Sequence, residues 1–135
     1  MKFLFSPSPL WQSNGVALVR VIIGLLLIYH GLEIFRPEIM KGYMDWETFN
    51  SPMGKFLVYV GKASELIAGI FLFLGLFTRL ACIMAMGTFL YITFLVGKGR
   101  FWYEDQHPFL FVMLAVLLFF TGPGAWSLDG VLKRE

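Results

Sequence analysis

Four long apolar blocks alternate with short polar segments along this chain. The blocks cover about residues 14–35, 54–77, 80–96 and 104–121. Crossing a hydrocarbon core roughly 30 Å thick takes about 20 predominantly apolar residues, so each block has the size of one transmembrane helix. The pattern predicts an all-α fold, an integral membrane four-helix bundle with short loops.

The segments between the blocks indicate how the helices connect. Residues 38–53 form the longest loop and mix charged with aromatic side chains, which predicts a short interfacial helix around residues 43–49. Thr78 and Arg79 leave room only for a tight turn, so we expect the second and third helices to be antiparallel neighbours. Residues 1–135 then form a single membrane domain.

Composition supports a lipid environment and excludes several classes of protein. The hydrophobic fraction is 58% and the charged fraction 15%, and the mean hydropathy is +0.72, values too apolar for a soluble domain. Four spans nearly exhaust 135 residues and leave no room for a separate catalytic domain. The net charge is +2 without a basic run, so no nucleic-acid partner is predicted. Cys82 is the one cysteine, which excludes an intrachain disulfide or a CxxC redox pair.

An even number of spans places both chain termini on the same side of the membrane. The basic residues that set orientation nearly balance between the two sides. One side holds Lys2, Arg79, Lys133 and Arg134, and the other holds Arg36, Lys41, Lys55, Lys98 and Arg100. The terminal pair Lys133-Arg134 favours termini in the cytoplasm.

Five ionisable residues fall inside apolar blocks, namely Arg20, His30, Glu33, Lys62 and Glu65. A central charge costs about 2.5–3.5 kcal/mol on the insertion scale, and one apolar side chain returns roughly 0.3–0.6 kcal/mol. The helix that carries Lys62 and Glu65 therefore cannot expose both to lipid, and their spacing of three places them on one face. We expect Arg20, Lys62 and Glu65 to point inward, and small residues such as Gly24 and Gly31 to mark the contact with the second helix.

The depth of these residues suggests one candidate site. At a rise of about 1.5 Å per residue, His30 lies near the end of the first helix and Glu65 near mid-membrane. The fourth helix begins on the same side as His30. We expect a polar mouth that leads toward Lys62 and Glu65 and is formed by His30, Glu33, Glu104, Asp105 and His107. All seven are ligand or proton-relay candidates, Arg20 is a structural or charge-pair candidate, and no catalytic residue is assigned.

Each of these residues also has a purely structural interpretation. Lys62 and Glu65 can simply join helices, as can Arg20, and acids at the start of a helix favour its dipole. A metal held by His30, Glu33, Glu104 and His107 would have suitable ligands, but their spacing matches no established template, so no metal site is predicted. Haem held by His30 and His107 is not predicted either, because two histidines in one chain are common by chance.

Three stretches resemble the DoxX/DoxD family, and they occur in order over nearly the whole chain. They are Arg20–Gly24 continuing through Tyr29-His30-Gly31, Glu65–Gly69 continuing through Leu74–Arg79, and Gly122–Asp129. The resemblance implies a four-helix protein of the bacterial inner (plasma) membrane, sometimes a subunit of thiosulfate:quinone oxidoreductase or a partner in a membrane-associated redox complex. Many relatives carry Lys where this chain has Ile34, so an anion-binding role of that Lys is not carried over.

These observations together lead to one functional hypothesis and two open alternatives. The hypothesis is a membrane subunit whose polar core binds a quinone-like or other small polar-headed ligand and relays protons, with an oxidoreductase as partner. His30 and Lys62 would hydrogen-bond a carbonyl oxygen, and Glu65 would exchange protons. The chain would be an accessory subunit rather than a self-sufficient enzyme. The alternatives are a small transporter or permeation module, and a non-enzymatic assembly factor; a homo-oligomer is compatible with each of the three.

Overall fold

In the computed structural model, which describes residues 2–132, every regular element is a helix. The α-helices are α1 (Gln12–Gly31), α2 (Pro37–Met44), α3 (Pro52–Leu74), α4 (Thr78–Tyr91), α5 (Gln106–Thr121) and α6 (Leu128–Leu132). Short 3-10 turns cover Lys2–Phe5, Leu32–Phe35 and Glu47–Phe49, and a π-helical segment, Ile92–Val96, continues α4. The prediction of an all-helical chain is confirmed.

Three helical stretches are long and apolar enough to cross a membrane. They are Gln12–Phe35, Pro52–Leu74 and Thr78–Val96. The fourth predicted span corresponds to α5, which is apolar but has only 16 residues. Sixteen helical residues extend about 24 Å at 1.5 Å per residue, less than the roughly 30 Å of a hydrocarbon core. The fourth span therefore remains a prediction.

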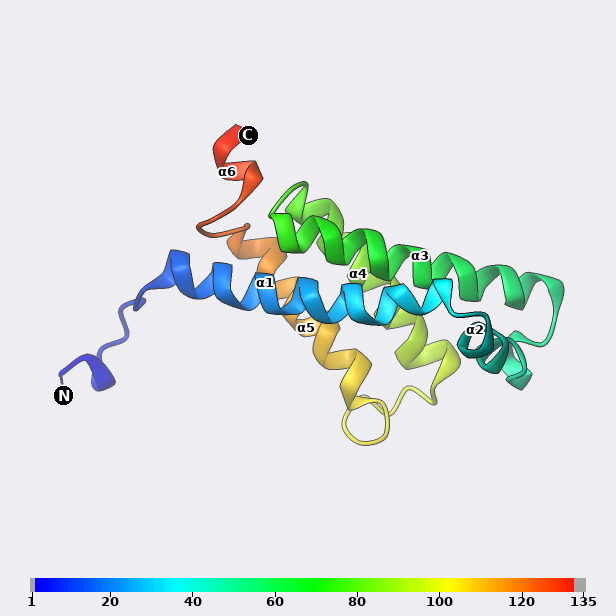
Figure 1. The fold of residues 1–135 in the computed structure, drawn as a ribbon. Helices are drawn as coiled ribbons and strands as arrows, with labels where there is room; N and C mark the ends of the chain where they lie inside the picture. Colours follow the sequence, from blue (N-terminus) through cyan, green and yellow to red (C-terminus); the bar gives the residue numbers. More distant parts are fainter. Residues whose placement is uncertain (1, 133–135) are drawn as a thin grey trace.

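The helices pack in the order α1, α3, α4, α5, with α1 and α3 forming the most extensive contact (Figure 1). Glycines make this contact close. A Cβ atom added to Gly24 would lie 2.6 Å from the backbone nitrogen of Phe73, and one added to Gly31 would lie 2.5 Å from the Cα of Leu66. The prediction that small residues mark the contact between the first two long helices is confirmed, because only glycine lets these backbones touch.

The turn between α3 and α4 lies at residues 75–77, earlier than the predicted turn at Thr78 and Arg79. Gly75 has a φ of 66°, which a glycine adopts without steric cost. Thr78 instead begins α4, because the carboxylate of Asp129 accepts hydrogen bonds from the backbone N–H groups of Phe77 (2.8 Å) and Thr78 (2.9 Å). A side chain from the far end of the chain thus caps this helix.

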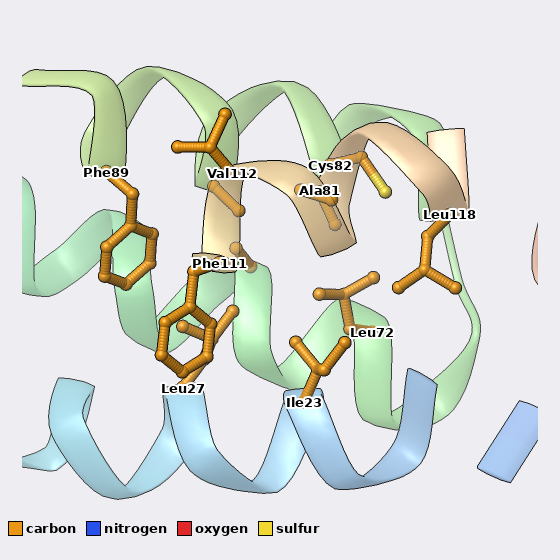
Figure 2. Packing of buried hydrophobic residues seen from close by; sticks show 12 residues of the cluster. Ile23, Leu27, Leu72, Ala81, Cys82, Phe89, Phe111, Val112 and Leu118 are labelled. Carbon is orange, nitrogen blue, oxygen red and sulfur yellow. The ribbon is translucent and has the colours of Figure 1, made fainter. Parts of the chain in front are cut away.

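The main apolar core lies between α1, α3, α4 and α5 (Figure 2). Phe89 and Phe111 stack within it, with ring centroids 4.9 Å apart and an interplanar angle of 16°. Ile23, Leu27 and Leu72 fill the space beside them. The buried charged residues Arg20 and Glu65 are not members of this cluster.

A smaller apolar cluster holds the connection between α1 and α3 in place. Met40 of α2, Phe49 and Val58 are buried together. The short helix expected between the first two spans is therefore present as α2, somewhat earlier in the chain than residues 43–49. Its position at a membrane surface remains a prediction.

Candidate functional site

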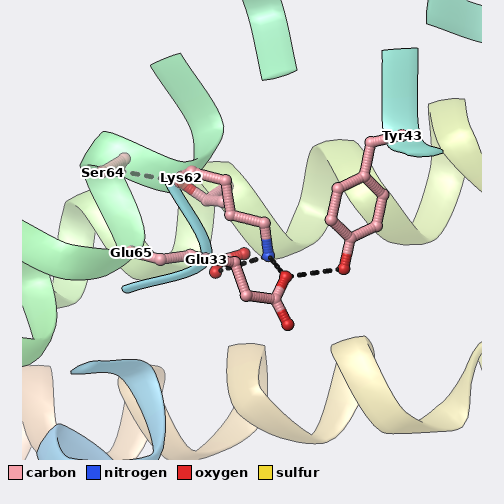
Figure 3. A network of polar contacts seen from close by, with 6 residues as sticks. Glu33, Tyr43, Lys62, Ser64 and Glu65 are labelled. Atoms are coloured by element: carbon pink, nitrogen blue, oxygen red, sulfur yellow. Dashed lines mark hydrogen bonds and ion pairs between the residues drawn. The ribbon is translucent and has the colours of Figure 1, made fainter. Parts of the chain in front are cut away.

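The ammonium group of Lys62 lies at the centre of a polar cluster that joins α1, α2 and α3 (Figure 3). It lies 3.0 Å from Oε2 of Glu33, just beyond the end of α1, and 3.2 Å from Oε2 of Glu65 on its own helix. The Tyr43 hydroxyl donates a hydrogen bond of 2.8 Å to the same Glu33 oxygen, and the ammonium lies 4.8 Å from the Tyr43 ring centroid. We call Glu33, Tyr43, Lys62 and Glu65 the charged cluster.

The charged cluster is largely withdrawn from the surface. Side-chain exposure is 12% for Lys62, 18% for Glu33 and 6% for Glu65. The inward orientation predicted for Lys62 and Glu65 is confirmed. One ammonium thus faces two carboxyl groups, those of Glu33 and Glu65.

Tyr43 of α2 lies outside the three stretches that are long and apolar enough to cross a membrane. Burial raises the pKa of its phenol, and the hydrogen bond donated to Glu33 raises the pKa further. The phenol therefore stays protonated near neutral pH and acts as a donor to Glu33.

A cavity of about 420 Å³ adjoins this cluster, between α3, α4 and the connection that contains α2. Lys62, Glu65, Ser64 and Thr88 provide polar groups on its wall. The rest of the wall is mostly aromatic and aliphatic: Tyr43, Trp46, Phe49, Leu57, Val58, Val60, Gly61, Gly87, Tyr91, Ile92 and Val96. Cavities of roughly 300–1,000 Å³ with few polar groups on an apolar wall are typical of small-molecule sites.

Two hydroxyl groups extend the polar part of the wall from α3 to α4. The Oγ1 of Thr88 lies 2.9 Å from the Oγ of Ser64 and 2.9 Å from the carbonyl oxygen of Met84. The π-helical segment that follows α4 contributes Ile92 and Val96 to the same wall. Such segments occur frequently at functional sites because the extra residue re-aims side chains.

Sequence reasoning missed Tyr43, Ser64 and Thr88 as parts of this site. Hydroxyls inside apolar blocks were a usable signal for Ser64 and Thr88, because a polar group facing lipid would be unfavourable. Tyr43 offered no signal, since its loop position says nothing about the helix against which it packs.

Two acids of the expected polar mouth have partners in the loop before α5. Glu104 pairs with Arg100 at 3.3 Å, and both side chains are exposed. The Asp105 carboxylate accepts hydrogen bonds from the backbone N–H groups of Lys98 (3.0 Å) and Arg100 (2.9 Å) and closes the loop before α5. These two acids thus have partners in their own loop, and a role for them in ligand binding remains a prediction.

His30 and His107 are far apart in the sequence but close enough in space to interact electrostatically. His30 is half-buried and interacts electrostatically with Lys62, Glu33 and His107. His107 is exposed and packs edge-on against Phe111, with ring centroids 5.4 Å apart. His30 therefore borders the charged cluster. Within residues 2–132 no group of three or more His, Cys, Asp or Glu side chains is placed to hold a metal ion.

Arg20 is fully buried, as predicted, but it belongs to a second polar site. Its Nη1 donates to the carbonyl oxygens of Pro123 (2.5 Å) and Ala125 (3.0 Å), and its Nη2 donates to that of Trp126 (2.8 Å). The Ala125 N–H in turn donates to the carbonyl oxygen of Ser13 at 3.0 Å. Arg20 thus fixes the segment after α5 against α1, which favours its structural interpretation.

Comparison with known proteins identifies relatives of similar length. A sequence model of the DoxX family matches residues 15–98. A Bacillus subtilis protein named "Putative oxidoreductase CatD" is 32% identical, over 85% of this chain and 84% of the relative. An uncharacterized protein of Haemophilus influenzae is 30% identical (89% and 92%), and an uncharacterized membrane protein of Mycobacterium tuberculosis is 25% identical (90% and 83%). No solved structure matches the chain significantly.

Proposed function

The chain belongs to the DoxX family, and we propose that it is the membrane partner of a redox complex that binds a quinone-like amphiphile in the cavity beside Lys62 and Glu65. The observation that carries the proposal is the cavity itself, which joins a buried charged cluster to an apolar wall. A ligand with a polar head and an apolar body matches both parts.

The apolar part of the wall suits a flat ring. Trp46 and Phe49 stack with ring centroids 6.3 Å apart and an interplanar angle of 26°, and both line the cavity. Aromatic faces favour stacking with another ring. Ser64 of α3 and Thr88 of α4 also line the cavity, where they can position an oxygen substituent of the ring.

The redox assignment rests on the family and on one relative. The Bacillus subtilis relative is named as an oxidoreductase, and no residue in this chain is assigned as an electron carrier. In the proposed arrangement a partner protein supplies the electron transfer, and Glu65, which lines the cavity, exchanges protons with the ligand.

The proposed setting is the bacterial inner membrane. Three helices qualify as spans, and we propose α5 as the fourth, packed on α4. Both termini would then lie on one side, and α2 would lie at the opposite surface. The residues Lys133 and Arg134, which favour cytoplasmic termini, lie outside the described residues.

The test is to identify what the full chain retains through purification in mild detergent, by mass spectrometry of extracted small molecules. Wild-type protein is expected to carry a lipophilic quinone in near-stoichiometric amount. Gly87→Leu should lose it, because Gly87 lines the cavity and a Cβ there meets no atom within 4 Å. Gly15→Leu is the matched control, since Gly15 is equally unobstructed but does not line the cavity.

Three results would contradict the proposal. Absence of any quinone in the wild-type protein, combined with failure of added quinone to bind, rejects the ligand. Solute uptake into liposomes that depends on Lys62 would support a transporter instead. A protein partner that binds equally well when the cavity is filled by Gly87→Leu would support an assembly factor.

A further inference from the structure

We infer that the cavity opens sideways into the bilayer through a gap between α3 and α4 at Gly61 and Gly87, and that its ligand is a long-tailed amphiphile whose tail leaves through this gap into lipid. The inference rests on the proposed function, because it concerns the same cavity. It adds the path by which the ligand enters and the part of the ligand that stays outside.

The cavity lies where α3 and α4 have separated. The two helices meet at the turn of residues 75–77 and diverge away from it (Figure 1). The two helices contribute wall residues from their diverging halves, within residues 57–65 of α3 and within residues 87–96 of α4 and the π-helical segment. The cavity therefore occupies a space that the contact between the two helices leaves open.

Gly61 and Gly87 keep this space open on both helices. A Cβ atom added to either glycine would meet no atom within 4 Å. Glycine is a poor helix former, so a glycine within a helix usually has a packing reason. Neither of these two glycines allows a close backbone approach of the kind made by Gly24 and Gly31. What each contributes to the cavity wall is empty space.

The rim of the cavity is apolar, and the charged groups lie deeper. Of the described residues that line the cavity, Trp46, Val60 and Gly87 are exposed, and none of them carries a charge. The side chains of Lys62 and Glu65 are 12% and 6% exposed. A ligand that enters at the rim thus passes an apolar surface before it reaches the charged groups.

The gap lies at the depth of the hydrocarbon core. Gly87 is the middle residue of the stretch Thr78–Val96, and Gly61 lies near the middle of Pro52–Leu74; both stretches are long and apolar enough to cross a membrane. The middle of a membrane span lies near the centre of the bilayer. An opening at this depth leads to acyl chains rather than to water.

This placement determines the kind of ligand that fits. A cavity of about 420 Å³ has the size for a head group, and a long apolar tail needs room beyond it. Exposure of such a tail to water is unfavourable, whereas in lipid the tail keeps apolar surroundings. A head that enters between Gly61 and Gly87 reaches Lys62 and Glu65 while its tail stays in the bilayer.

The experiment compares two probes that share one ring. They are 2-methyl-1,4-naphthoquinone, which has no tail, and menaquinone-4, in which the same ring carries an isoprenoid tail. Each probe is titrated into the full chain in mild detergent, and native mass spectrometry gives the fraction of protein that carries it. We expect both probes to bind, because the tail of menaquinone-4 lies outside the cavity.

Val60→Trp tests the gap. The larger side chain at the rim should crowd the tail and weaken the binding of menaquinone-4 by about tenfold, while the affinity for the tailless probe stays within about twofold. Ile67→Trp is the matched control, because Ile67 is 42% exposed on the same helix, against 45% for Val60, but does not line the cavity. This control should leave both affinities unchanged.

A nitroxide label tests the opening without any ligand. In a Cys82→Ala background, Ser64→Cys places the label on the cavity wall. In liposomes the label should collide more often with oxygen, which concentrates in the hydrocarbon, than with a water-soluble nickel chelate. This measurement keeps the inference testable if Val60→Trp does not fold, and more frequent collisions with the nickel chelate would overturn the lateral opening.

The outcomes separate the two proposals. Binding of the tailless probe alone overturns the inference and leaves the proposed function intact. The same holds if Val60→Trp leaves the binding of menaquinone-4 unchanged or weakens both probes equally. Failure of both probes to bind overturns both proposals. A dimer in native mass spectrometry that Val60→Trp dissociates would show that a second copy of the chain fills the gap, which also overturns the inference.

Discussion

Lys62 of α3 and Glu33, just beyond α1, form an ion pair of 3.0 Å, shorter than the 3.2 Å contact between Lys62 and its neighbour on the same helix, Glu65. The pair connects two helices rather than two turns of one helix. Lys62 thus keeps a partner when either carboxylate is removed. Removing Lys62, in contrast, takes away the one ammonium or guanidinium that the two carboxylates contact within residues 2–132. This asymmetry has a direct consequence for stability.

Lys62→Met should destabilise the protein far more than Glu65→Gln. Breaking a buried ion pair by removing one partner costs about 3–5 kcal/mol, and here it strands two carboxylates. Glu65→Gln leaves Lys62 paired with Glu33 and should cost about 1–2 kcal/mol. Denaturant unfolding of the purified variants in detergent measures both values.

A variant that compensates for the loss of Lys62 must also remove the carboxylates of Glu33 and Glu65. The triple change Glu33→Gln, Lys62→Met and Glu65→Gln should recover most of the stability lost in Lys62→Met, because no buried charge then lacks a partner. Equal losses from Lys62→Met and Glu65→Gln would show that Glu33 does not pair with Lys62.

Gly31→Ala should separate α1 from α3. The added Cβ would lie 2.5 Å from the backbone of Leu66, where no side-chain rotation can relieve the overlap. Overpacking of this kind costs about 1–3 kcal/mol. Gly15→Ala is the control, because its Cβ would meet nothing within 4 Å and the change should be neutral or stabilising by up to about 1 kcal/mol. Equal changes in the thermal stability of Gly31→Ala and Gly15→Ala would contradict the close contact between α1 and α3.

Arg20→Lys should loosen the segment after α5, although it keeps the charge. The guanidinium reaches three carbonyl oxygens, those of Pro123, Ala125 and Trp126, through two nitrogens, and an ammonium cannot reproduce that fork. We expect a loss of about 2 kcal/mol and faster hydrogen exchange over residues 122–132. Arg79→Lys, at an exposed arginine that donates to the Phe119 carbonyl, should leave exchange in that segment nearly unchanged. Unaltered hydrogen exchange over residues 122–132 in Arg20→Lys would show that Arg20 does not hold the segment after α5 in place.

The four-span topology predicts which single cysteines share a side of the membrane. Cys82 is the one native cysteine and is buried, so Cys82→Ala provides a cysteine-free background. In that background Lys41→Cys and Lys98→Cys should react with an impermeant maleimide from one side, and Lys2→Cys from the other. Labelling of Lys2→Cys and Lys98→Cys from the same side would reject four spans.

The sequence by itself determined the helical class, the membrane setting and the burial of certain residues. These depend on local composition, since an apolar block long enough to span a membrane must satisfy its backbone hydrogen bonds internally. The same energetics required Arg20, Lys62 and Glu65 to face the bundle, and burial of all three side chains confirms it. Gly24 and Gly31 were recognisable as contact residues because small side chains on one face allow close helix packing.

Only the tertiary structure decided which buried groups meet. Tyr43 reaches Glu33, Arg20 reaches the carbonyl oxygens after α5, and Asp129 caps α4. Each contact joins residues from different elements, and it depends on the rotation and register of packed helices to within about an ångström. Hydrophobic periodicity fixes the inward face of a helix but not that register. The cavity has the same origin, because its wall is assembled from α3, α4, the π-helical segment and the connection around α2.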